Sequence, residues 1–284
     1  MPQIEASLAE RLGYAADTRL LIVNCDDFGS SHAANSAILR ALDHGVATSA
    51  TLMVPCPWAR DAVRRAEGRD VGVHLTLTCE YPGYRWRSLT GAKSLHDDDG
   101  FMPATVEAVY ARADPSEAFE ECKAQIVQAM DWGLQPTHLD SHMGTVQIDP
   151  RFFDIYLGLA EAFDLPLRMV SEKQDVQLGL QGRERASSRG LLFNDHFVSP
   201  WPRDTREVID ERIPHLKPGV SEIYAHPVED GPELRAYDPD HPDIRANDAI
   251  VLTDPAVAQF MDAAGVVRIG WRPLRDLQRA ERGR

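Results

Sequence analysis

The sequence has few cysteines, and they form none of the patterns that bind metal or pair as disulfides. Its 284 residues contain four, all far apart in the chain: Cys25, Cys56, Cys79 and Cys122. No Cys-x-x-Cys motif occurs, so the sequence gives no indication of a thiolate zinc site or of the disulfide framework of a small secreted domain. We expect four free, buried thiols in a reducing compartment.

Basic residues are scarce relative to acidic ones, and long apolar runs are missing. There are 30 Lys and Arg against 44 Asp and Glu, a net charge of −14, so the basic footprint of a protein that binds nucleic acid or an anionic membrane is absent. No segment has the uninterrupted apolar length of a membrane span. Residues 1–19 carry acids and lack the apolar core of a secretory signal. We therefore expect a cytoplasmic protein whose partner is a small molecule, with no nucleic acid and no membrane.

The composition is otherwise that of an ordinary globular protein, at 43% hydrophobic and 26% charged residues. Short apolar segments alternate with segments of helical pattern, the spacing of parallel βα units. Strands are expected from residue 20 to the Asp26-Asp27 pair and over 47–54, 71–77, 136–142, 165–170, 191–198, 220–227 and 266–269. Helices are expected after Ser30 or Ser31, after Pro57, after Asp114, after Asp149, and over 204–215 and 254–264. Residues 79–103, 172–190 and 229–248 are expected to be loops.

Seven or eight such units in one chain fit an α/β fold of TIM-like (β/α) barrel type, distorted or incomplete, and a doubly wound sheet is the alternative. No internal repeat or linker divides the chain, so a single domain is the simplest account. We expect an N-terminal extension over residues 1–19, a barrel domain over 20–275 and a C-terminal tail over 276–284. The aromatic residues of the 79–103 loop would either stack on a sugar ring or pin the loop to the body.

The pair Asp26-Asp27 ends the first strand abruptly. Two adjacent carboxylates repel each other unless a cation or a shared proton relieves them, which makes the pair a candidate site. The alternative is that an Asp after a strand caps the helix that follows, by accepting hydrogen bonds from its free N–H groups. Taken alone, the pair favours the helix cap.

Three histidines fall at the ends of other expected strands, namely His74, His142 and His226. Each of them, taken singly, has an ordinary explanation as a buried or strand-end histidine. In parallel α/β folds, however, the carboxyl ends of the strands meet at one face, where ligands bind. An Asp/His/His set offers the mixed oxygen and nitrogen donors of Zn²⁺ and related metals, and three protein ligands leave positions open for water and substrate. The double Asp then offers one ligand and one proton acceptor.

These residues carry a family resemblance that extends over most of the chain. The segments 24–29, with Asn35 and 45–49 after them, 72–78, 136–142 and 222–227 resemble, in order and spacing, the motifs of the YdjC-like (ChbG-type) carbohydrate deacetylases. The resemblance implies a distorted (β/α) barrel that hydrolyses the N-acetyl group of an acetylated amino sugar or oligosaccharide. It also implies one divalent metal ion, Mg²⁺ or Zn²⁺.

Carried over by position, the resemblance makes Asp27, His74 and His142 the metal ligands. Asp26 would be the general base, and His226 the acid that protonates the leaving amine. Arg168 would orient the base or support the developing charge, with a structural salt bridge as the alternative. Asp140 and His138, also in the third motif, would support the ligands or have a purely structural role rather than bind the metal.

The sequence departs from the family at two positions close to the third ligand. Where family members usually carry histidines, this chain has Gly144 and Val146, so specificity for chito-oligosaccharides does not transfer. Two other functions remain open: a metal-dependent sugar lyase or isomerase on the same barrel, and a non-catalytic sugar-binding protein. The oligomeric state is also open, with a homodimer as one option.

Overall fold

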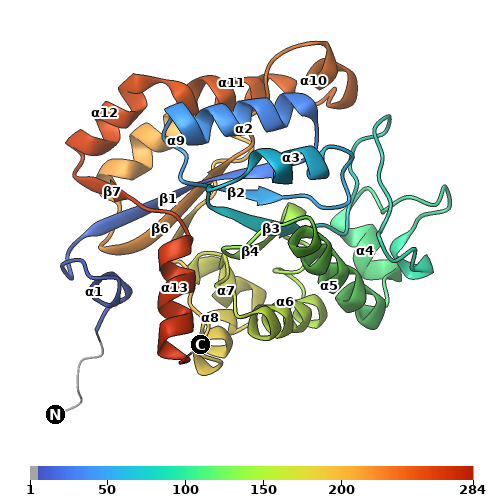
Figure 1. Cartoon of the computed structure of the whole chain (residues 1–284), viewed down its shortest axis with the longest axis horizontal. Helices are drawn as coiled ribbons and strands as arrows, with labels where there is room; N and C mark the ends of the chain where they lie inside the picture. The colour runs from blue at the N-terminus through green and yellow to red at the C-terminus, as the bar shows by residue number, and fades with distance from the viewer. Residues whose placement is uncertain (1–5, 284) are drawn as a thin grey trace.

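Strand β1 (Arg19–Phe28) lies at the centre of a parallel sheet in the computed structural model, which describes residues 6–283 (Figure 1). In this part of the chain the sheet has seven strands in the order β4-β3-β2-β1-β6-β5, and β7 pairs with β1 as well. The other strands are β2 (Ser49–Leu52), β3 (Val71–Leu75), β4 (Leu139–Ser141), β5 (His196–Val198), β6 (Gly219–Ala225) and β7 (Val266–Arg268).

The strand order distinguishes the two predicted architectures. Written from its other edge as β5-β6-β1-β2-β3-β4, it is a cyclic permutation of the chain order, without the reversal that marks a doubly wound sheet. Isolated parallel bridges join Leu139 to Leu167 and Leu167 to Phe193, which continues the pairing from β4 toward the segment that leads into β5. The sheet is therefore a half-barrel, consistent with the distorted barrel that the sequence predicted.

Helices cover the outside of the curved sheet (Figure 1). Five of the predicted starts are confirmed, because each capping side chain accepts a hydrogen bond from the first turn of a helix. These caps are Ser31, Asp114, Asp149, Asp204 and Asp254. The helices are α1 (Leu8–Arg11), α2 (His32–His44), α3 (Ala59–Arg65), α4 (Val106–Arg112), α5 (Pro115–Asp131), α6 (Pro150–Phe163), α7 (Glu172–Leu178), α8 (Gly182–Ser188), α9 (Thr205–Arg212), α10 (Pro232–Tyr237), α11 (Pro242–Thr253), α12 (Pro255–Ala263) and α13 (Arg272–Glu281). Helix α11 packs against α2 and α9.

Two of the predicted loops are wrong. Residues 172–190 form helices α7 and α8, and residues 229–248 include α10 and the first half of α11. Helices α7, α8 and α10 are two turns or shorter, so no apolar stripe of helical period can develop in the sequence. The start of α7 nevertheless has a sequence signal, a capping box between Ser171 and Gln174.

The predicted strand 165–170 is reduced to a single bridged residue. Pro166 has no N–H to donate to a neighbouring strand, although its carbonyl accepts the N–H of Leu139. Leu167 donates to Leu192, and Arg168 donates its N–H to Leu139 before its side chain turns toward the cavity. The segment therefore fills the place of a strand with only three backbone hydrogen bonds.

The two ends of the chain form helices on the body of the domain. Helix α1 begins with a capping box between Ser7 and Glu10, and residues 1–5 lie outside the described part of the chain. Helix α13 runs across the predicted boundary at residue 275, and its Gln278 accepts the N–H of Leu192 with a distance of 2.7 Å. The predicted domain limits remain predictions.

The long segment 79–103 is ordered and tied to the rest of the molecule. The buried carboxylate of Glu121, on α5, accepts hydrogen bonds from the backbone and the hydroxyl of Thr90 at 2.9 and 2.8 Å. The hydroxyl of Tyr84 donates to the carbonyl of Ser30 at 2.7 Å. The aromatic side chains of this segment therefore pin it to the body, one of the two expected uses.

All four cysteines are free and buried, as predicted. Within residues 6–283, no helix combines the length and the apolar character required to cross a bilayer.

Candidate active site

The six side chains singled out in the sequence line one cavity of about 460 Å³ at the carboxyl ends of the strands. They are Asp26, Asp27, His74, His142, Arg168 and His226. Each comes from a different strand or strand-like segment, except for the adjacent pair on β1. The parallel direction of the strands is what places all of them at the same end of the sheet.

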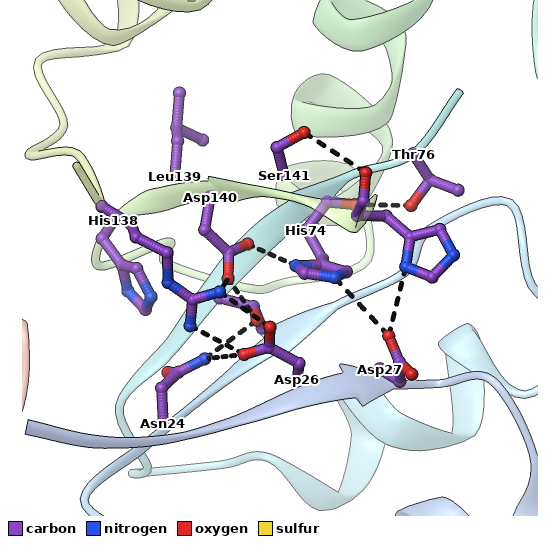
Figure 2. A network of polar contacts seen from close by, with 12 residues as sticks. Asn24, Asp26, Asp27, His74, Thr76, His138, Leu139, Asp140 and Ser141 are labelled. Carbon is purple, nitrogen blue, oxygen red and sulfur yellow. Dashed lines mark hydrogen bonds and ion pairs between the residues drawn. The ribbon is translucent and has the colours of Figure 1, made fainter. Parts of the chain in front are cut away.

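The end of β1 is irregular, and this irregularity lets both acids face the cavity. Neighbouring residues on a regular strand point to opposite faces. Here the register with β2 shifts between Cys25 and Phe28, and Asp27 has a φ of 65°. Figure 2 shows both carboxylates directed toward the same group of side chains. Helix α2 is capped by Ser31 instead, so the pair does not serve as the helix cap.

One oxygen of Asp27 lies between two imidazole rings. Its Oδ1 is 3.5 Å from Nε2 of His74 and 3.3 Å from Nδ1 of His142. This buried atom has no partner that satisfies hydrogen-bond geometry among residues 6–283. Burial alone would raise the pKa of Asp27, but the surrounding histidines, His226 first, and Arg245 hold it well below its usual value. The carboxylate is therefore ionised and lacks a full complement of donors.

The other nitrogen of each imidazole is held by a second carboxylate. Nδ1 of His74 is 2.6 Å from Oδ1 of Asp140, and Nε2 of His142 is 2.9 Å from Oε2 of Glu80. Burial would lower both histidine pKa values, but these carboxylates raise the pKa of His74 to about 10 and that of His142 to about 9. Such partners fix the ring orientation of metal-binding histidines and increase their basicity.

This group fits a divalent metal ion. One ligand atom each from Asp27, His74 and His142 lies within 4.8 Å of the other two. Two imidazole nitrogens and one carboxylate oxygen are a donor set that Zn²⁺ and related ions accept, with positions left for water and substrate. The unpartnered oxygen of Asp27 is the atom that such a cation would satisfy.

A second acidic group surrounds Asp26, and it already contains a cation. Nη1 and Nη2 of Arg168 are each 2.7 Å from an oxygen of Asp26, a bidentate pair. The same guanidinium lies 2.9 Å from Asp140 and 3.0 Å from Glu222. A second set of ligand atoms is also close enough together to hold a metal, one each from Asp26, His74 and Asp140. The guanidinium of Arg168, however, already pairs with both carboxylates of this set.

Asp26 is ionised although it is buried. Burial would raise its pKa, but the adjacent Arg168 outweighs this effect and lowers the pKa to about 2. Asn24 adds a hydrogen bond of 2.8 Å to Oδ1. The carboxylate is thus fixed in place next to the proposed metal ligands and is not itself one of them.

His226 closes the cavity from the end of β6. Its ring packs edge-on against Trp201 and Tyr224, with ring centroids 4.9 and 5.3 Å away. Its backbone N–H donates to Oδ2 of Asp248 at 2.8 Å. Burial lowers the pKa of His226 to about 4, despite the opposing attraction of Asp27. The ring is therefore neutral near pH 7.

Asp140 contacts the proposed ligands, whereas His138 does not. His138 stacks on Trp271 with a centroid distance of 4.7 Å, buried and outside the cavity. Asp140 bonds to His74 on one side and to Arg168 on the other. Of the two positions that depart from the family, Gly144 lines the cavity and Val146 is buried.

Sequence reasoning missed three charged residues of the site: Glu80, Arg245 and Asp248. Glu80 follows β3 by only five residues, so its place near the strand end was a usable signal. Arg245 and Asp248 belong to a segment that was predicted to be a loop. Nothing in its pattern indicates that Arg245 reaches Oδ2 of Asp27, at 2.7 Å and 218 residues away in the chain.

Comparisons with known proteins agree with the resemblance noted in the sequence. The chain is 37% identical over 276 residues to a carbohydrate deacetylase of Thermus thermophilus, covering 95% of this chain and 98% of that protein. It is 33% identical over 257 residues to a carbohydrate deacetylase of Geobacillus stearothermophilus, covering 89% of this chain and 97% of that protein. Proteins of this name are hydrolases of carbon–nitrogen bonds other than peptide bonds, the predicted enzyme class.

The fold also has a solved counterpart. A crystal structure from Enterococcus faecalis V583, of a protein provisionally described as a cellobiose-phosphate cleavage protein, superimposes with a TM-score of 0.79. It has 24% sequence identity and covers 90% of this chain and 99% of its own. The family model described as YdjC-like protein matches residues 20–263. By this match and by the two relatives above, the chain belongs to the YdjC-like family.

Proposed function

We propose that this protein is a metal-dependent hydrolase that removes the N-acetyl group from an acetylated amino sugar or oligosaccharide. The observation that carries the proposal is the unpartnered Oδ1 of Asp27 between two imidazoles, one residue away from a second carboxylate held by an arginine. The names of the similar proteins support the substrate class. The proposal includes one divalent ion, Mg²⁺ or Zn²⁺, and a fold that is a distorted barrel of TIM type.

Asp27, His74 and His142 would hold the metal, which supplies Lewis-acid polarisation of the amide carbonyl and makes a water molecule more acidic. Asp26 then accepts the proton of the attacking water. Arg168 holds both oxygens of Asp26 and so fixes the direction in which the base acts. A general base placed in this way accelerates such reactions by about 10²–10⁴-fold.

His226 would donate the proton that the leaving amine needs when the carbon–nitrogen bond breaks. Because the ring is neutral at rest, it must first take up a proton from solvent, and the proton that Asp26 accepts from water returns to solvent, so the two transfers balance over one turnover. Trp201 and Tyr224 pack around the ring and offer aromatic surface to a sugar in the cavity.

An acetate-release screen tests the proposal. Purified protein is loaded with Zn²⁺ or Mg²⁺ and incubated with a panel of N-acetylated mono- and oligosaccharides, and free acetate is measured. We expect acetate with at least one sugar, and its loss in Asp27→Ala and His74→Ala. If no sugar in the panel yields acetate with metal bound, the hydrolase assignment is wrong.

The same screen separates the other functions left open by the sequence. A sugar lyase or isomerase would change the carbon skeleton without releasing acetate, which product analysis by mass spectrometry detects. A sugar-binding protein without activity would give a calorimetric binding signal and unchanged sugar. Either result would replace the deacetylase proposal.

A further inference from the structure

Helix α11 directs two buried charged side chains at the site from outside the sheet. Arg245 and Asp248 are three residues apart, so they lie on the same face of the helix, and they are only 5% and 1% exposed. Charged side chains are seldom buried unless they are paired. Each of these two bonds to a residue that the proposed mechanism uses.

Arg245 connects Asp27 to another acid, Asp238. Its Nη1 is 2.7 Å from Oδ2 of Asp27, and its Nε is 2.7 Å from Oδ2 of Asp238. The guanidinium also lies over the rings of Tyr81 and Trp201, at 5.8 and 5.2 Å from their centroids. One oxygen of Asp27 is thereby occupied, and Oδ1 alone is left to face His74 and His142.

Asp248 reaches the residue at the end of β6. Its Oδ2 accepts the backbone N–H of His226 at 2.8 Å, and this hydrogen bond fixes the chain where β6 ends. Its other oxygen is buried without a partner among residues 6–283. Asp248 therefore fixes the main chain that carries His226, and its hydrogen bond is to the backbone and not to the ring.

The helix itself is held firmly against the start of the sheet. The carbonyl of Leu252 accepts the N–H of Val46 at 2.9 Å, immediately after α2. At Gly45 a Cβ atom would come within 2.1 Å of this carbonyl oxygen, so only glycine permits the approach. Val228, just after β6, donates its N–H to the carbonyl of Arg245 at 3.1 Å. Helix α11 is thus tied to the turn that follows α2 and to the segment that follows β6.

We propose that helix α11 is the positioning element of this site: Arg245 restricts Asp27 to one free oxygen for the metal, and Asp248 sets the direction of His226. The proposal rests on the function proposed above and adds two residues to it. It separates their effects, because Arg245 acts on metal binding and Asp248 acts on proton donation.

The experiment compares Arg245→Gln, Arg245→Lys and Asp248→Asn with the control Ile250→Ala, whose side chain on the same helix is 68% exposed. Zn²⁺ binding to metal-free protein is measured by calorimetry, thermal unfolding is measured without metal, and acetate release gives kcat and KM. We expect Arg245→Gln to raise the Kd for Zn²⁺ about 10–100-fold, the usual effect of losing a residue that orients a ligand. Arg245→Lys should recover only part of this loss, because an ammonium cannot bridge two carboxylates as a guanidinium does.

Asp248→Asn is expected to bind Zn²⁺ as the wild type does, with kcat lowered about 10–100-fold and KM unchanged. Ile250→Ala should change neither quantity. The proposal is overturned if Arg245→Gln binds Zn²⁺ normally, if Asp248→Asn weakens Zn²⁺ binding equally, or if both Arg245 variants unfold without metal and so show a purely structural role. A wild-type protein that binds Zn²⁺ but releases no acetate would remove the proposed function and leave the Arg245 result standing, whereas one that binds no Zn²⁺ overturns both.

Discussion

The two aspartates at the end of β1 each pair with an arginine, but the two arginines leave them in different states. Asp26 shares Arg168 with Asp140 and Glu222, so a cation from the chain itself fills that group. Asp27 faces two imidazoles and keeps one oxygen without a partner. Arg168 therefore satisfies both oxygens of Asp26, whereas Arg245 reaches only Oδ2 of Asp27 and leaves Oδ1 without a hydrogen-bond partner among residues 6–283. The difference favours separate roles: Asp26 is held in place as a base that does not bind the metal, and Asp27, with its unsatisfied oxygen, is suited to bind it.

Asp140 stands between the two aspartates. It lies 2.9 Å from Arg168 and bonds to His74, the contact that Figure 2 shows. Asp140 therefore links the surroundings of Asp26 to those of Asp27. Substitutions on the two sides should consequently differ in their effects on metal binding, on turnover and on stability.

Exchanging each acid for its amide should separate the two sides most clearly. Asp27→Asn removes the anionic donor and should abolish Zn²⁺ binding and acetate release together. Asp26→Asn should bind Zn²⁺ normally, while kcat falls by about 10²–10⁴-fold through loss of the base. Calorimetry and acetate release on the same preparations provide the measurement. Zn²⁺ bound by Asp27→Asn and not by Asp26→Asn would reverse the assignment.

Removing Arg168, the cation beside Asp26, should lower the free energy of unfolding. Arg168→Met leaves three buried carboxylates without their counterion, and breaking a buried ion pair in this manner costs about 3–5 kcal/mol of unfolding free energy. Urea unfolding of metal-free protein measures this loss. The matched change Arg245→Met removes a cation that faces only two acids, so its cost should be smaller. Equal losses would contradict the view that Arg168 is the structural centre of its group.

The two carboxylates that support the histidines should differ because only one of them is shared. Glu80→Gln should weaken Zn²⁺ binding about 10–100-fold with little change in stability, since its side chain is 23% exposed and contacts His142 alone among the proposed ligands. Asp140→Asn should weaken Zn²⁺ binding and also lower the free energy of unfolding, because it loses the ion pair with Arg168. Calorimetry combined with thermal unfolding distinguishes these patterns. A loss of stability confined to Glu80→Gln would be inconsistent with the shared role of Asp140.

Glu222, which shares Arg168 with Asp26, should make the stability of the protein depend on pH. Burial raises the pKa of Glu222 to about 7, although Arg168 opposes the shift, whereas an unfolded glutamate titrates near about 4.3. The folded state therefore keeps a proton that the unfolded chain has lost, so this stabilisation is present at low pH and is lost as the pH rises through 7.

Glu222→Gln cannot ionise and should lack this loss. Its stability relative to the wild type should rise between pH 5 and 7, by at most about 1.4 kcal/mol per pH unit. Urea unfolding at a series of pH values measures the difference. A difference that is constant over this range would show that Glu222 is ionised throughout.

The sequence predicted the residues at strand ends well, because each polar residue follows directly on the apolar strand that positions it. Asp26, Asp27, His74, His142 and His226 follow apolar segments whose direction is set by the βα rhythm, so their meeting at one face requires only the fold class. Helices with a strong N-cap, such as the one after Asp114, were also located correctly.

The outer partners could not be predicted in the same way. Glu80 lies in an irregular segment, and Arg245 approaches Asp27 from a helix that the polar sequence of 229–248 concealed. Contacts between residues more than two hundred positions apart depend on how helices pack, and no local pattern encodes them. Arg168 was noticed as a candidate, but its role as counterion to three acids became visible only when the half-barrel placed them around it.

The left-handed backbone at Asp27 limits which amino acids this position can accept. With a φ of 65°, the position suits Asp and Asn, whose short polar side chains tolerate this conformation, and it disfavours β-branched and bulky residues. A designer who wished to change the metal by exchanging this ligand would therefore have a narrow choice. The backbone conformation at this position, more than the preference of the cation, limits which side chains can serve as the ligand here.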